Sequence, residues 1–172
     1  NMKTLFKKIV ITILKLEAKI ILARFKPKII AVSGTVGKTS AKEAIALVIG
    51  SEFDVRKSEK SYNSEIGVPL TIIGAKTGWG SFKQWLAIIF KGLKVFLFAS
   101  DYPKFLILEV GVDRPNDMEK MISWVKPYAA VITAVGTIPV HVQYFSGPEE
   151  LISEKRKLVE CLSENNWAVL NI

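Results

Sequence analysis

A glycine-containing loop between a strand pattern and a helix pattern constrains the fold of this chain more than any other feature. Residues 28–32 form a short β-branched run, residues 41–49 have helical periodicity, and between them stands Gly34-Thr35-Val36-Gly37-Lys38-Thr39. Glycines let backbone N–H groups approach phosphate oxygens, and the start of a helix adds a partial positive charge. The segment therefore predicts a loop that binds the phosphates of a nucleoside triphosphate.

This loop predicts a role for each of its polar side chains. Lys38 can reach the β- and γ-phosphates of ATP, and the Thr39 hydroxyl would ligate Mg²⁺. The common form of the pattern has a further glycine where Val32 stands, so this loop departs from it. We predict nucleotide contacts from seven consecutive residues: Gly34, Thr35, Val36, Gly37, Lys38, Thr39 and Ser40.

Strand and helix patterns alternate along the chain. Strands are expected at residues 28–32, 53–56, 105–110, 129–135 and from 167 onward, and helices at residues 41–49, 79–99, 115–125 and 148–162. Residues 62–74, interrupted by Gly67 and Pro69, are expected to be irregular. The alternation predicts an α/β fold of the P-loop NTPase type, with a mainly parallel sheet and helices on both faces.

Glu109 stands at the carboxyl end of a predicted buried strand, where the ligands of such sheets bind. A carboxylate facing a phosphate-binding loop can hold the Mg²⁺ that bridges the phosphates. A lone carboxylate at a strand end can also be merely solvated, so the residue pattern by itself leaves both interpretations open.

The first 27 residues predict a basic amphipathic helix, followed by one domain over residues 28–172. Lys8, Lys15, Lys19 and Lys26 fall on one face of this helix. The pattern fits a helix on an anionic membrane surface and equally a helix packed against a protein. Its apolar runs are too short to span a bilayer, and no secretory cleavage site follows them.

Composition restricts the partners and the compartment. The net charge is +8, but the basic residues are spread along the chain without an arginine-rich stripe, so we expect no nucleic acid. The single cysteine, Cys161, cannot form an intramolecular disulfide, which fits a reducing compartment. We expect a cytoplasmic protein, with contact to the inner face of the membrane through the first helix left open.

Several ordered motifs are similar to those of the Mur ligases. Residues 33–43 resemble the loop of that family, which lacks the earlier glycine, and residues 62–71 resemble a stretch typical of its MurF branch. Residues 108–111 with 115–117 resemble the family's Glu-x-Gly segment, which implies that Glu109 holds Mg²⁺. The resemblance covers roughly residues 28–172 and implies substrate contacts from Asn63 and Ser64.

The resemblance also implies a second metal site. Residues 132–136 followed by His141 are similar to a Thr-Asn-Ile-Gly-x-x-His segment of the family, with Ala134 in place of the asparagine. His141 would help to hold a second Mg²⁺, although a lone histidine is more often structural. Lys155, fourteen residues later, matches a lysine that the family carries as a metal-ligating carbamate. Gln143 and Lys157 stand where the family has glutamates.

The implied reaction is ATP-dependent amide-bond formation in peptidoglycan precursor synthesis. A carboxylate of UDP-MurNAc-tripeptide would attack the γ-phosphate to give an acyl phosphate, from which the amine of D-alanyl-D-alanine would displace phosphate. Lys38, His141 and Lys155 are the implied catalytic residues, with ATP and Mg²⁺ as cofactors. No sugar-binding segment precedes the loop and the sequence ends at residue 172, so we expect little turnover from this chain alone.

Three other interpretations stay open. A Mur-like ligase or amidotransferase subunit that acts on lipid-linked precursors would account for the basic first helix, but its zinc-ribbon cysteines are missing here. A folylpolyglutamate-synthase-like ligase shares the loop but not residues 63–71. A non-catalytic nucleotide-binding module or a membrane-docked scaffold, which would bind ATP weakly or not at all, fits the substitutions at Ala134, Gln143 and Lys157.

Overall fold

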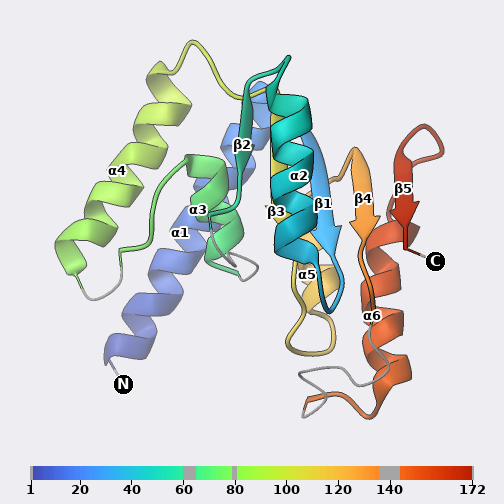
Figure 1. Cartoon of the computed structure of the whole chain (residues 1–172). Coiled ribbons are helices and arrows are strands. Elements are labelled where there is room, and N and C mark those ends of the chain that lie inside the picture. Colours follow the sequence, from blue (N-terminus) through green and yellow to red (C-terminus); the bar gives the residue numbers. More distant parts are fainter. Residues whose placement is uncertain (1, 60–64, 79–80, 136–143, 172) are drawn as a thin grey trace.

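Five parallel strands form one sheet in the computed structural model of the chain, which describes residues 2–59, 65–78, 81–135 and 144–171. The strand order is β2-β3-β1-β4-β5, and helices lie in front of and behind the sheet (Figure 1). The predicted α/β fold with a parallel sheet is confirmed.

Most elements begin and end within a few residues of the predicted positions. The strands are β1 (Lys28–Ser33), β2 (Val55–Lys57), β3 (Phe105–Glu109), β4 (Ala129–Ile132) and β5 (Trp167–Leu170). The helices are α1 (Met2–Phe25), α2 (Lys38–Gly50), α3 (Gly67–Ile73), α4 (Phe82–Phe98), α5 (Asp117–Ile122) and α6 (Pro148–Glu160). α5 is shorter than predicted because its N-cap residue, Asn116, has a left-handed backbone with φ 68°, which a right-handed helix cannot include.

β1 lies at the centre of the sheet, and the strands that follow it in the chain are added first on one side of it and then on the other. β1 pairs with β3 on one side and with β4 on the other, so the strand order changes direction at this point. In an open α/β sheet, ligands bind in the crevice outside the carboxyl ends of the strands at such a switch point. The glycine loop follows β1 directly and therefore lies at this crevice.

Alternate residues of β1 face opposite sides of the sheet, as the two-residue period of a strand requires. Ile29 and Ala31 belong to the larger hydrophobic core, which they share with residues of α1, α3, α4, α5 and α6. Ile30 and Val32 belong to a smaller cluster that is covered by α2. Helices therefore cover both faces, but one face carries most of the core.

α3 corrects the prediction that residues 62–74 are irregular. Residues 67–73 form a helix in which all seven residues are buried. Pro69 is compatible with this helix because it lies in the first turn, where backbone N–H groups have no acceptor inside the helix. Gly74 ends the helix with a left-handed backbone at φ 76°, the usual role of glycine at that position.

α1 uses its apolar face to pack against its own domain. Val10, Leu14, Ala18 and Ile21 are buried in the larger core and are spaced by three or four residues, so they share one face of the helix. The helix contacts α3 and α4. Among the described residues, no helix is both long and apolar enough to cross a bilayer. The division at residue 27 stays a prediction.

Candidate functional site

The glycine loop takes a backbone path that side chains would obstruct. Gly34 has φ 144° and Gly37 has φ 85°, both in the region that favours glycine. A Cβ at Gly34 would overlap the Thr133 hydroxyl, so the close approach of β1 and the segment after β4 also requires glycine. The two glycines let the chain turn sharply from β1 into α2.

The loop leaves the start of α2 available to an anion. Its N-cap residue is Gly37, which has no side chain to accept from the N–H groups of the first helical turn. The Thr35 and Val36 N–H groups donate to the Ala134 carbonyl at 2.9 and 3.3 Å, and Lys38 Nζ donates to the Thr35 carbonyl at 3.2 Å. The helix N-terminus and Lys38 therefore lie together at the crevice, an arrangement that suits phosphate.

Glu109 and Thr39 meet across the crevice. The Thr39 hydroxyl donates to Glu109 Oε2 at 3.2 Å, and the Glu109 residue is only 1% exposed. Hydroxyl and carboxylate oxygens are ligands that Mg²⁺ accepts, so this pair fits the predicted metal. Thr35 Oγ1 is buried without a hydrogen-bond partner among the described residues, which leaves one more oxygen near the loop for a ligand. No group of three or more His, Cys, Asp or Glu side chains converges in the described part of the chain.

Two further residues support Glu109, and the sequence analysis assigned a role to neither. Lys42 is completely buried, and its Nζ lies 3.6 Å from Glu109 Oε2. The Glu109 N–H donates to Ser58 Oγ at 3.1 Å, just after β2. The signal for Lys42 was its spacing, because a residue four positions after Lys38 lies on the same face of α2.

Lys155 lies under the glycine loop. Its residue is 6% exposed, and its Nζ donates to the Gly34 carbonyl at 3.0 Å. Burial and, to a smaller extent, the positive charge of Lys38 lower the pKa of Lys155 to about 8, while the negative charge of Asp113 opposes the change. A larger share of this amine is therefore neutral at pH 7 than for an ordinary lysine.

Lys157 joins α6 to α5. Its Nζ lies 2.8 Å from Glu154 Oε2 and 3.7 Å from Glu119 Oε2, and these partners raise the pKa of Lys157. The other Glu154 oxygen accepts from the Met118 N–H at 2.9 Å. Lys157 thus connects α6 to α5 in this chain. Lys155, two residues earlier on α6, lies on a different face of the helix and contacts the loop.

The structure brings together one part of the predicted site. Lys38, Thr39 and Ser40 begin α2, Glu109 ends β3 beside them, and Lys155 contacts the loop from below. Val36 is exposed at the tip of the loop. The other predicted residues lie outside the described residues: Asn63, Ser64, His141 and Gln143. Their roles stay predictions.

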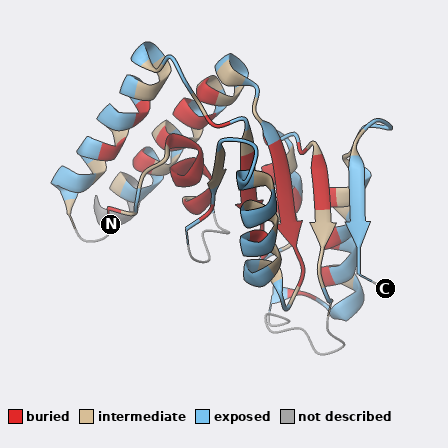
Figure 2. Cartoon of the chain, turned by 45° about the horizontal axis from the view of Figure 1, so that its top comes forward, coloured by how far each residue is buried: buried red, intermediate tan, exposed pale blue. Residues whose placement is uncertain are grey.

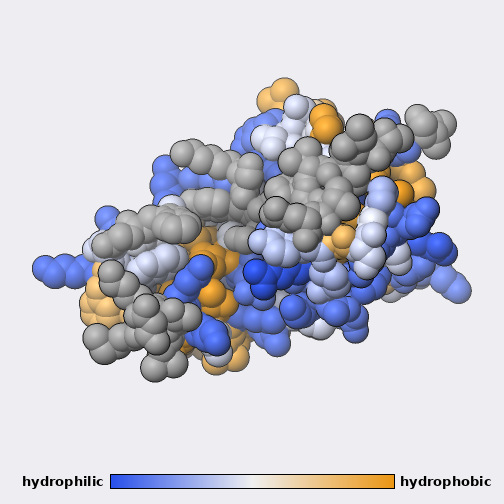
Figure 3. All heavy atoms as spheres, turned by 90° about the horizontal axis from the view of Figure 1, so that it is seen from below, coloured by the Kyte–Doolittle hydropathy of each residue, from blue (hydrophilic) through white to orange (hydrophobic). Residues whose placement is uncertain are grey.

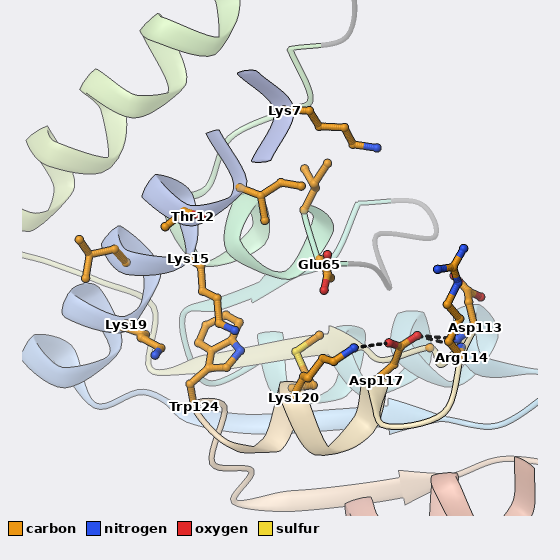
Figure 4. Close-up of a pocket in the computed structure, with 15 residues that line it drawn as sticks. Lys7, Thr12, Lys15, Lys19, Glu65, Asp113, Arg114, Asp117, Lys120 and Trp124 are labelled. Carbon is orange, nitrogen blue, oxygen red and sulfur yellow. Dashed lines mark hydrogen bonds and ion pairs between the residues drawn. The ribbon is translucent and has the colours of Figure 1, made fainter. Parts of the chain in front are cut away.

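A cavity of about 1060 Å³ opens next to the site, between α1, α5 and the segment after β3 (Figure 4). Its basic side chains come from both sides of the cavity: Lys7, Lys15, Lys19, Arg114 and Lys120. Its acidic side chains are Glu65, Asp113 and Asp117. Asp117 is already held, since its carboxylate accepts from the Arg114 N–H at 2.8 Å and lies 3.4 Å from Lys120 Nζ. The cavity therefore offers more cationic than anionic groups to a ligand.

Comparisons with known proteins agree with this arrangement. The Mur ligase middle domain family matches residues 91–172. The UDP-N-acetylmuramoyl-tripeptide--D-alanyl-D-alanine ligase of Rickettsia prowazekii (strain Madrid E) is 24% identical over 146 residues, which are 85% of this chain and 27% of the relative. The ligase of the same name from Bacillus subtilis (strain 168) is 25% identical over 155 residues, 90% of this chain and 28% of the relative.

A solved structure extends the likeness to three dimensions. The crystal structure of MurF ligase from Thermotoga maritima in complex with ADP is similar with a TM-score of 0.69 and 26% identity, over 94% of this chain and 31% of that one. The chain thus spans less than a third of the length of these relatives. Together with the loop and its neighbours, these matches show that the chain is similar to Mur ligase middle domains, and its relatives over most of its length are MurF ligases.

Proposed function

We propose that the protein to which this chain belongs is a MurF-type ligase, which joins D-alanyl-D-alanine to UDP-MurNAc-tripeptide, and that this chain binds its ATP and Mg²⁺. The observation that carries the proposal is the convergence of the glycine loop, the Thr39–Glu109 pair and Lys155 at one edge of the sheet. The names of the relatives and the ADP bound to one of them support the same function.

In the proposed reaction, the loop and the start of α2 hold the phosphates. Lys38 stabilises the negative charge that the γ-phosphate carries while a substrate carboxylate attacks it. Glu109 and Thr39 would hold Mg²⁺, which supplies further neutralising charge when it is bound. The product of this step is an acyl phosphate, and the amine of D-alanyl-D-alanine then displaces inorganic phosphate to form the amide.

The lowered pKa of Lys155 supports its predicted carbamoylation. The ammonium first loses one proton, the neutral amine then attacks CO₂ to form a C–N bond, and a second proton leaves the nitrogen, so a cationic side chain becomes an anionic one. Burial favours this change because it makes the neutral amine more abundant. In ¹³C NMR with ¹³C-bicarbonate we expect a carbamate carbon signal that Lys155→Met removes and that Lys157→Met retains.

The cavity beside the site gives an anionic substrate a way to approach. It begins at Gly111, two residues after Glu109, and continues along the basic side of α1 (Figure 4). A peptide with free carboxylates carries charge opposite to that of the lysines that line the cavity. We propose that the acceptor peptide reaches the γ-phosphate along this cavity.

Two experiments test the proposal at separate levels. Calorimetric titration of Mg-ATP into the 172-residue chain should give saturable binding that Lys38→Ala weakens at least about tenfold, because a charged phosphate contact is worth about 1.5–3 kcal/mol. Lys76→Ala, which removes a largely exposed lysine, should bind as the unmodified chain does.

Ligase turnover is tested in a protein of the length of the relatives, with UDP-MurNAc-tripeptide and D-alanyl-D-alanine as substrates and phosphate release as the readout. Phosphate release that depends on both substrates supports the ligase. Nucleotide binding without such release would favour a non-catalytic nucleotide-binding module.

A further inference from the structure

α4 carries an exposed apolar face along its whole length. Five large apolar side chains are spaced by three or four residues, so they form one stripe, and each is between 39% and 67% exposed: Phe82, Leu86, Phe90, Leu93 and Leu97. Figure 2 shows α4 at the edge of the molecule with much of its outer side exposed. In Figure 3, hydrophobic residues reach the surface among hydrophilic ones on the side where α1 and α4 lie.

Basic side chains border this stripe. On a helical projection, Lys83 and Lys94 follow the stripe directly on one side, and α4 contains no acidic residue. The opposite edge of the stripe turns toward α1, against which Ile89 and Phe96 are partly buried. The exposed surface of α4 is therefore apolar in the middle and cationic at its free edge.

The net charge of the whole chain resides in α1 and α4. These two helices contain nine of the 24 basic residues and one of the 16 acidic residues, which gives them a formal charge of +8. The remaining residues contain 15 basic and 15 acidic side chains, so the rest of the chain is neutral. The one acidic residue of the pair, Glu17, is buried between them. The excess charge of the chain therefore belongs to these two helices, one of which carries the apolar stripe.

α1 and α4 lie side by side and run in the same direction. The rings of Phe6 and Phe82, near the two N-termini, are 5.2 Å apart between centroids. Near the C-termini, the Arg24 guanidinium donates to the carbonyls of Phe96 and Ala99. Because the apolar face of α1 packs in the core, most of the large apolar side chains that the pair leaves exposed belong to α4.

We propose that the outer face of α4 docks on an anionic lipid bilayer, with α4 lying in the plane of the interface and Lys83 and Lys94 contacting lipid phosphates. An amphipathic helix with an apolar face and flanking lysines binds such a surface without crossing it. A second copy of the chain is a poor match for this face, since it would bring an equal excess of positive charge against it. The inference does not rest on the proposed ligase activity.

Flotation with lipid vesicles tests the proposal on the 172-residue chain. We expect the chain to float with vesicles of phosphatidylglycerol and phosphatidylcholine, to bind vesicles of phosphatidylcholine alone at least about tenfold less, and to lose binding as salt rises. Phe90→Asp should lower the partition coefficient at least about tenfold, because it removes a ring from the stripe and adds a negative charge.

Leu47→Asp is the matched control, because Leu47 is an apolar residue 79% exposed on α2 and the substitution changes the net charge equally. It should float as the unmodified chain does. Circular dichroism checks that both variants are folded. Equal flotation of Phe90→Asp and Leu47→Asp would overturn the role of α4, since adsorption would then depend on net charge alone. A dimer in sedimentation equilibrium that Phe90→Asp dissociates, without flotation of any form, would overturn the lipid as the partner.

Discussion

Two buried glutamates, Glu17 and Glu109, differ in the polar and charged groups that lie next to their carboxyl groups. Glu109 is 1% exposed at the end of β3, with the Thr39 hydroxyl at 3.2 Å and Lys42 Nζ at 3.6 Å from its Oε2 atom. Glu17 is 5% exposed between α1 and α4, and neither of its carboxylate oxygens has a hydrogen-bond partner among the described residues. Burial raises the pKa of Glu17 to about 7.

The comparison shows that burial alone does not identify a functional carboxylate. An ionised group is costly to bury unless other groups pair with it, so the partners decide what burial means. At Glu109 the partners hold the carboxyl group at the crevice where phosphates and a cation would bind. At Glu17 their absence among the described residues makes the charge a cost to stability near neutral pH.

Removing the positive partner of Glu109 should have the largest effect on stability. Lys42→Met leaves a buried carboxylate without its ammonium partner, and we expect the free energy of unfolding to fall by about 3–5 kcal/mol. Urea denaturation followed by circular dichroism measures the change. The double variant Lys42→Met/Glu109→Leu should recover most of the loss, because it removes both charges. A double variant as unstable as the single one would mean that Lys42 acts through packing instead.

Removing the charge of Glu17 should raise the free energy of unfolding. Glu17→Gln keeps the shape of the side chain but cannot ionise, so we expect the free energy of unfolding at pH 8 to rise by about 2 kcal/mol. The pKa of Glu17 is about 7 in the folded chain and 4.5 for an unperturbed glutamate, so the folded state binds more protons between these values. Stability of the unmodified chain should therefore fall as pH rises from 4.5 to about 7 and then level off.

The pH series also contains the control for Glu17. The difference in unfolding free energy between Glu17→Gln and the unmodified chain should be small at pH 4.5 and should reach its full value above pH 7. A difference that is equal at both pH values would show that ionisation of Glu17 contributes nothing to stability.

A substitution in α4 next to Glu17 should have a smaller effect on the free energy of unfolding. A Cβ at Gly92 would overlap the Glu17 carboxylate, so Gly92→Ala should lower the free energy of unfolding by about 1 kcal/mol. In the Glu17→Ala background the carboxylate is gone and alanine favours the helix, so the same substitution should become neutral or stabilising. Equal losses in both backgrounds would mean that the two residues do not interact.

The sequence predicted the part of the site that depends on local pattern. The glycine loop, Lys38 and Thr39 follow from the spacing of residues in one turn, and Glu109 follows from its place at the end of an apolar run. The burial of Lys42 and the support from Ser58 depend on which strand lies beside β3, and the strand order cannot be read from residue types. Glu17 did leave a signal, since it falls on the apolar face of α1 between Leu14 and Ile21.

The helices and strands with clear periodicity were predicted, whereas the helix α3 was not. Its seven residues are apolar nearly throughout, so they have no alternation, and Gly67 and Pro69 both suggested a loop. α4 was predicted as a long apolar helix, but its pattern could not show which side would remain uncovered. That distinction depends on α1, which packs along one side of α4 only.

The most direct test compares the nucleotide affinity of Glu109→Gln and Glu17→Gln, by calorimetric titration of ADP with and without Mg²⁺. Each variant replaces one buried carboxyl group by an amide of the same shape. We predict that Glu109→Gln weakens binding at least about tenfold with Mg²⁺ and far less without it, because the carboxylate acts through the cation. Glu17→Gln should bind as the unmodified chain does. Unchanged Mg-ADP affinity in Glu109→Gln, or an equal loss in Glu17→Gln, would contradict the assignment of Glu109 to the nucleotide site.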